Sequence, residues 1–94
     1  MTARATSTVL TDNDRVRVTR WRFLPGAATG WHVHEHDYVI VPLTDGTLKL
    51  VEPAGTRDSH LSVGEPYFRE AGIKHDVVNA NDHDFTFIEI EIKQ

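Results

Sequence analysis

The sequence predicts an all-β protein, an antiparallel β-barrel or jelly roll with about eight short strands. Three observations support this fold class. Apolar and polar residues alternate in several short segments, of which FTFIEIEI near the C-terminus is the clearest. Glycine and proline interrupt the chain about every eight to twelve residues, as they do in barrels and sandwiches. No segment of useful length carries the apolar spacing of an amphipathic helix.

The first predicted strand covers residues 15–23, RVRVTRWRF. Its apolar positions change phase between Val18 and Trp21. A slip of one residue inside a strand predicts a β-bulge near Thr19 or Arg20. Further strands are expected at residues 31–34, 38–43, 47–50, 61–63, 66–69, 75–79 and 85–92.

The last of these strands has two chemically different faces. Ile88, Ile90 and Ile92 share one face, and Glu89 and Glu91 point to the other, because side chains alternate along a strand.

The length of the chain fits one small domain. A chain of 94 residues has no room for two cores, and it buries only about 60–65% of the surface that its unfolded state exposes. Residues 14–94 are therefore expected to form a single domain. Residues 1–13 are expected to be an N-terminal arm that is either loose or paired as an edge strand.

Composition excludes several classes of function. The chain has no cysteine, which rules out disulfides, cysteine–zinc sites and thiol catalysis. The net charge of −4 argues against binding to nucleic acid, because an acidic chain repels phosphate backbones. The longest apolar run, residues 38–43, is far too short to span a membrane. We expect a cytoplasmic protein without nucleic-acid or membrane partners.

A histidine cluster in residues 30–36, GWHVHEH, carries the strongest chemical signal. His32 and His34 are two residues apart, so on a strand they point to the same face with Cα atoms about 6.6 Å apart. From that distance two imidazoles can share a metal ion at about 2.1 Å. A helical pair formed by His32 and His36 is the rival geometry, and surface histidines on a polar strand are the alternative without a metal.

A metal ion needs at least one more ligand from elsewhere in the chain. His75 is the best candidate, because it stands alone in a turn-rich segment, AGIKHDVVN. Imidazole ligands suit iron, nickel, copper and zinc, and the sequence does not separate these metals.

The spacing of these residues resembles the two motifs of the cupin superfamily. The first cupin motif is G(X)5HXH(X)3,4E(X)6G, and the second is G(X)5PXG(X)2H(X)3N. The matching positions of the first motif are Gly26, His32, His34 and Gly46, and those of the second are Gly64, Gly72, His75 and Asn79. Together with the flanking strands, the resemblance covers residues 14–92 and implies a cupin β-barrel.

The sequence departs from the cupin motifs at two positions. Glu70 replaces the proline of the second motif. The glutamate of the first motif is replaced by Tyr38 or Val39, depending on the spacing. The chain therefore resembles cupins that hold a metal with three histidines, such as acetylacetone-cleaving and thiol dioxygenases. It is also similar to small single-domain bacterial cupins that are associated with β-alanine degradation.

The resemblance implies one divalent metal ion, either iron, nickel, zinc or manganese, bound by His32, His34 and His75. Tyr38 and His36 are the candidate catalytic residues, and Arg69 and Tyr67 are the candidate substrate-binding residues. An inward Arg69 would suit a substrate carboxylate. The alternatives are a barrel-wall tyrosine, a solvated turn histidine and an arginine that reaches the rim to pair with Glu65 or Glu70.

These residues predict a small metal-binding cupin that acts on a small carboxylate by oxygenase, lyase or isomerase chemistry. The alternative is a non-catalytic module that binds a small ligand, or a structural dimeric cupin. A homodimer is expected, because a core this small leaves part of the apolar surface exposed to solvent. Three apolar residues are expected to face away from the metal side, namely Val39, Val41 and Val78. A solvated outer strand face or a dimer contact is expected for the crowded arginines, namely Arg15, Arg17, Arg20 and Arg22.

Overall fold

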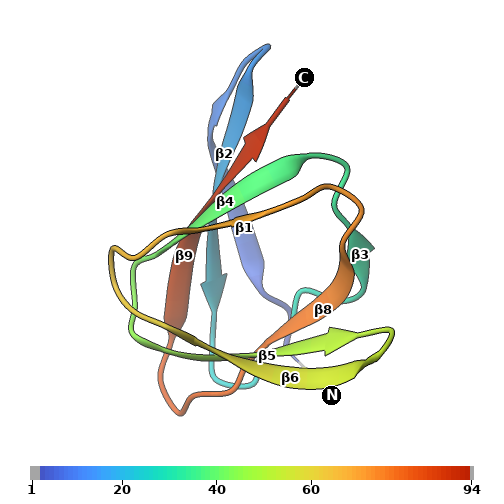
Figure 1. The fold of residues 1–94 in the computed structure, drawn as a ribbon. Helices are drawn as coiled ribbons and strands as arrows, with labels where there is room; N and C mark the ends of the chain where they lie inside the picture. Colours follow the sequence, from blue (N-terminus) through green and yellow to red (C-terminus); the bar gives the residue numbers. More distant parts are fainter. Residues whose placement is uncertain (1–2, 94) are drawn as a thin grey trace.

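The computed structural model describes residues 3–93, which form nine strands and no helix (Figure 1). The strands are β1 (Thr6–Asp12), β2 (Val16–Phe23), β3 (His32–Val33), β4 (Asp37–Pro42), β5 (Gly46–Glu52), β6 (Gly55–Leu61), β7 (Tyr67–Arg69), β8 (Lys74–Asn79) and β9 (Phe85–Ile92). A five-stranded sheet has the order β1-β2-β9-β4-β7, and a four-stranded sheet has the order β3-β8-β5-β6. All strand pairs in the two sheets are antiparallel, which confirms the predicted fold class.

The core lies between the two sheets. It is built from the inward side chains of strands from both sheets, because residues alternate between the two faces of each strand. The buried cluster consists of Phe23, Ala27, Tyr38, Ile40, Leu48, Leu50, Leu61, Val77, Phe85 and Phe87. No helix in residues 3–93 is long and apolar enough to cross a membrane.

The predicted bulge in the second strand is wrong. β2 pairs with β9 in continuous register from Val16 to Phe23. The apolar phase changes because Val16 and Val18 face outward, whereas Trp21 and Phe23 face the interior. The register shift that does occur lies in β1, between Val9 and Thr11.

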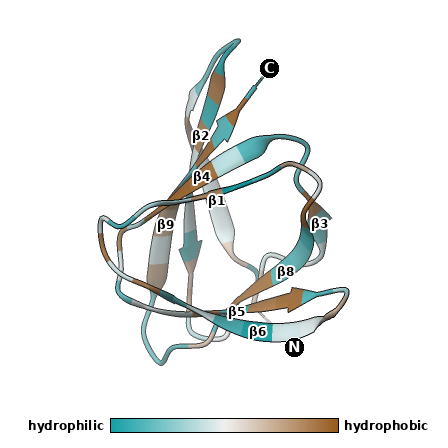
Figure 2. Cartoon of the chain, viewed as in Figure 1, coloured by the Kyte–Doolittle hydropathy of each residue, from teal (hydrophilic) through white to brown (hydrophobic). Residues whose placement is uncertain are grey.

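The outer face of the five-stranded sheet is apolar at its centre. Hydrophobic residues recur along β2, β4 and β9, as the brown bands in Figure 2 show, and they alternate with the inward residues of these strands. These outward residues are Val16, Val18, Ile88, Ile90, Ile92, Val39, Val41 and Phe68. Most are half-buried, and Phe68 is 54% exposed. We call this set the outer apolar face.

Two asparagines hold the end of the barrel that lies away from the histidines. Asn79 is 1% exposed, and its Nδ2 donates to the backbone oxygens of Phe23, Leu24 and His83 at 3.3, 3.2 and 2.9 Å. The Oδ1 atom of Asn81 accepts from the backbone N–H of Thr47 at 2.9 Å. These bonds tie the loop after β8 to β5 and to the end of β2.

Steric crowding explains why residue 46, one of the motif positions, is glycine. A Cβ atom at this position would lie 2.7 Å from Oδ1 of Asn81, which is closer than carbon and oxygen atoms pack. Only glycine therefore lets the Asn81 side chain reach the first residues of β5.

Candidate metal centre

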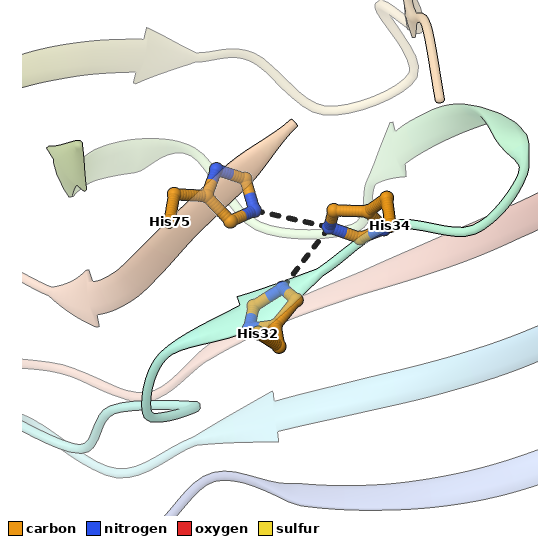
Figure 3. Close-up of side chains that lie close together, drawn as sticks. All are labelled: His32, His34 and His75. Carbon is orange, nitrogen blue, oxygen red and sulfur yellow. Dashed lines mark hydrogen bonds between the residues drawn. The ribbon is translucent and has the colours of Figure 1, made fainter. Parts of the chain in front are cut away.

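The three histidines predicted as ligands lie together on the inner side of the barrel (Figure 3). His32 lies on β3, and its cross-strand partner on β8 is His75. His34 follows β3 directly and is held by the segment that precedes β8. Its N–H donates to the oxygen of Ile73 at 2.9 Å, and its oxygen accepts from the N–H of Gly72 at 2.8 Å. Two neighbouring backbone segments thus fix all three Cα positions.

The imidazole rings converge through their Nε2 atoms. The Nε2 atoms of His32 and His34 are 3.0 Å apart, and those of His34 and His75 are also 3.0 Å apart. Figure 3 shows both contacts meeting at His34. Two nitrogens at this separation that each bind an ion at about 2.1 Å subtend an angle of about 90° at the ion. The arrangement fits three ligands on one face of a metal ion.

The proton positions also favour a cation between the rings. Nδ1 of His32 lies 2.9 Å from the oxygen of Gly30 and donates to it, which leaves a lone pair on Nε2. A single N–H on Nε2 of His34 cannot serve both His32 and His75. With neutral rings, at least one of the two contacts therefore lacks a well-directed hydrogen bond. A metal ion accepts all three lone pairs and removes this conflict.

Burial keeps two of the rings neutral. Burial, with the neighbouring His32 adding to the effect, lowers the pKa of His34 to about 4. Burial, together with the neighbouring His32 and His34, lowers the pKa of His75 to about 3. Because a metal binds the unprotonated nitrogen, both rings are ready to ligate at neutral pH.

Tyr38 lies directly against the metal centre. Its ring stacks on His34, with centroids 3.9 Å apart and planes 20° apart. Burial raises the pKa of Tyr38 to about 12, although Arg69 opposes this rise. The phenol therefore stays protonated at neutral pH and is able to donate a hydrogen bond.

The histidines open into a cavity of about 360 Å³, which is within the range for small-molecule sites. Tyr67 and Arg69, the predicted substrate-binding residues, line it from β7. Nε of Arg69 is buried and has no hydrogen-bond partner within residues 3–93. Nη2 of Arg69 lies 3.7 Å from a carboxylate oxygen of Glu52, which is a loose ion pair.

Four charged residues of the cavity lining were not predicted, and one of them is Glu35 in the turn before β4. Glu89 and Glu91 point inward from β9, and Arg17 points inward from β2. Arg17 was expected on a solvated outer strand face or in a dimer contact, and its place in the cavity wall contradicts the outer-face expectation. Its Nε and Nη2 donate to the two carboxylate oxygens of Glu91, both at 2.9 Å.

Glu89 has a different environment from Glu91. Burial raises the pKa of Glu89 to about 7, with the neighbouring Glu91 adding to the rise. Glu89 Oε2 lies 3.9 Å from Nδ1 of His34. The sequence carried a signal for its orientation, because Glu89 and Glu91 have the same phase as the core residues Phe85 and Phe87.

The other histidines stay outside the cavity. His36, a predicted catalytic residue, lies in the turn before β4 and does not line the cavity. Its catalytic role stays a prediction. His60 is exposed and contacts Thr47, and His83 is exposed and contacts the backbone oxygen of Asp45.

Known proteins resemble this chain in sequence and in structure. The cupin-domain family matches residues 19–91. The beta-alanine degradation protein BauB of Pseudomonas aeruginosa is 57% identical over 89 residues, which cover 95% of this chain and 94% of BauB. The crystal structure of a cupin domain from Bordetella pertussis is 50% identical and has a TM-score of 0.99, with 100% of this chain and 98% of that chain covered.

A more distant likeness is found to the polyketide cyclase RemF of Streptomyces resistomycificus. It is 26% identical and has a TM-score of 0.75, with 99% of this chain and 70% of that chain covered.

Proposed function

The chain belongs to the cupin family, and from this premise we propose that it is a metal-dependent protein acting on a small carboxylate. The observation that carries the proposal is the composition of one cavity. Three converging imidazoles lie in its wall together with Arg69, a cation whose Nε has no partner within residues 3–93.

The proposed metal ligands are His32, His34 and His75. A divalent ion held by three neutral imidazoles keeps its full charge and open positions, and supplies Lewis-acid or oxygen-activating chemistry. Iron, nickel, zinc and manganese all suit this role. Metal-dependent oxygenase, lyase and isomerase reactions each require a substrate held beside such an ion.

Arg69 is proposed to anchor the substrate carboxylate. Its side chain is 24% exposed, so water competes weakly with a bound anion. Hydrogen bonds between a guanidinium and a carboxylate are about twice as strong as neutral ones. Tyr67 lines the same wall from the same strand, and Tyr38 contributes a protonated hydroxyl. The cavity volume restricts the substrate to a small molecule.

The name of one relative agrees with this class of substrate. The beta-alanine degradation protein BauB aligns with nearly the whole chain. β-Alanine is itself a short carboxylate, so we propose a metabolite of similar size for this chain.

Calorimetric titration of the zinc-loaded protein tests the proposal. Propionate is expected to bind more tightly than propionamide, which has the same shape but no charge. Arg69→Met is expected to weaken propionate binding about 10- to 150-fold, since a charge-assisted hydrogen bond contributes about 1.5–3 kcal/mol. Arg57→Met is the control, because Arg57 pairs with the same Glu52 but lies on β6 outside the cavity.

Equal affinity for propionate and propionamide, or unchanged affinity in Arg69→Met, would refute the carboxylate site. Oxygen consumption and product formation by the iron-loaded protein then distinguish an enzyme from a non-catalytic binding module.

We also propose that the protein is a homodimer that pairs through the outer apolar face. This face ends in an exposed Arg20 on β2 and in Asp37 on β4. A twofold axis through the centre of the face would bring Arg20 of one copy towards Asp37 of the other. The charges at the two ends therefore suit a second copy of the same chain.

A further inference from the structure

We propose that Glu89 is a positioning residue for the metal ligand His34. In the metal-loaded protein, its carboxylate accepts a hydrogen bond from Nδ1 of His34 and holds Nε2 towards the ion. This inference rests on the metal site of the proposed function. It assigns a role to a buried carboxylate that is not itself a metal ligand.

His34 lacks the support that His32 already has. Nδ1 of His32 is held by the oxygen of Gly30 at 2.9 Å. Nδ1 of His34 forms no hydrogen bond within the described residues, and a carboxylate oxygen of Glu89 lies 3.9 Å from it. Histidines that bind metals usually donate their second ring N–H to a carboxylate or a carbonyl. Glu89 supplies such an acceptor.

The proposed hydrogen bond requires the 3.9 Å gap to close by rotation of the Glu89 side chain. The His34 ring lies flat on the Tyr38 ring, which fixes its plane. Glu89 lies opposite Ile40, two residues along β4 from Tyr38, whose own cross-strand partner is Glu91. The distance of 3.9 Å from Oε2 to Nδ1 of His34 is what places the Glu89 carboxylate beside the stack. The side chains of His34 and Glu89 are only 8% and 10% exposed.

Glu91, the neighbouring carboxylate on the same face of β9, does not compete for this role. Both of its oxygens accept hydrogen bonds from Arg17 at 2.9 Å. Glu89 is therefore the carboxylate of β9 that remains available to His34.

The position of Glu89 is also relevant to the glutamate of the first cupin motif, which this chain lacks. Tyr38 occupies one of its candidate positions and brings no charge. Glu89 supplies one negative charge to the metal centre from a different strand. Its carboxylate lies beside a ligand ring and does not bind the ion. A carboxylate in this place raises the basicity of the imidazole and strengthens its bond to the metal.

Zinc affinity, measured by competition with a chelator, tests the inference. Glu89→Ala is expected to weaken zinc binding about 10- to 100-fold, the effect typical of lost partners of metal ligands. Glu89→Gln keeps an acceptor oxygen and nearly the same shape, so a smaller loss is expected. The double variant that combines Arg17→Met with Glu91→Gln is the control, because it removes a carboxylate from the same face without changing the net charge. Its zinc affinity is expected to stay at the wild-type value.

A second readout is the Nδ1 proton of His34 in the NMR spectrum of the zinc-loaded protein. In the wild type and in Glu89→Gln it is expected to be visible and to exchange slowly. In Glu89→Ala it is expected to exchange fast. Glu89→Gln keeps the test valid if Glu89→Ala fails to fold.

The outcomes separate the two proposals. Wild-type protein that binds zinc, combined with unchanged affinity and an unchanged Nδ1 proton in both Glu89 variants, would refute the role of Glu89 alone. Wild-type protein that binds no divalent metal would refute the metal site and this inference together.

Discussion

Arg17→Met is predicted to destabilise the protein by about 2 kcal/mol at neutral pH. The variant leaves the Glu91 carboxylate unpaired in the cavity wall, where its side chain is 12% exposed. Removing one partner of a fully buried ion pair costs about 3–5 kcal/mol. The value expected here is lower, because Arg17 is 37% exposed and water screens part of the interaction.

The sign of the pH dependence follows from the same pair. The hydrogen bonds from Arg17 hold the pKa of Glu91 below its usual value of 4.5. The stabilisation is therefore fully present above pH 4.5, and it disappears as the pH falls and Glu91 becomes protonated. The difference between wild type and Arg17→Met should shrink accordingly.

Urea unfolding, followed by circular dichroism at pH 7 and at pH 3, measures this difference. In a thermal melt of a chain of this length, the same loss of about 2 kcal/mol corresponds to a fall in Tm of roughly 8–16 °C. Arg15→Met is the control, because the Arg15 side chain is exposed and forms no ion pair within residues 3–93. Equal stability of the two variants at pH 7, or a difference at pH 3 that is no smaller than at pH 7, would refute the role of this ion pair.

Three further predictions concern pH, assembly and packing. Metal-free protein should lose stability in urea as the pH falls from about 6.5 towards 4, because the folded state keeps His34 and His75 neutral while the unfolded chain takes up their protons. Protonation of Glu89 has the opposite effect on stability between about pH 7 and pH 4.5. One carboxyl does not offset two histidines, so constant stability over this range would contradict the lowered pKa values of His34 and His75. Ile90→Lys should turn a homodimer into a monomer in light scattering, whereas an unchanged mass would show that the outer apolar face is not the interface. Gly46→Ala should cost about 1–3 kcal/mol of unfolding free energy, and a Tm equal to that of the wild type would show that Asn81 moves aside freely.

Residues close in sequence made much of the metal centre predictable. His32 and His34 share a face because a strand alternates with a period of two, and this spacing predicts a common ligand site without knowledge of the fold. The third ligand, His75, was a weaker prediction until the second motif supported it, because the pairing of β3 with β8 joins residues that are far apart in the chain.

Charged residues inside the cavity were harder to predict. In the FTFIEIEI strand both faces carry large apolar residues, so hydrophobicity alone does not identify the inner face. The isoleucines form the outer apolar face, and the inner face continues from Phe85 and Phe87 to Glu89 and Glu91. The same ambiguity in β2 made Val18 and Trp21 resemble the two sides of a bulge.

Metal analysis of the protein purified without a histidine tag tests the central claim most directly. We expect one divalent ion per chain in the wild type and in His60→Ala, and almost none in His75→Ala. Equal metal content in all three proteins, or a wild type that binds no divalent metal after incubation with iron, nickel, zinc or manganese, would contradict it.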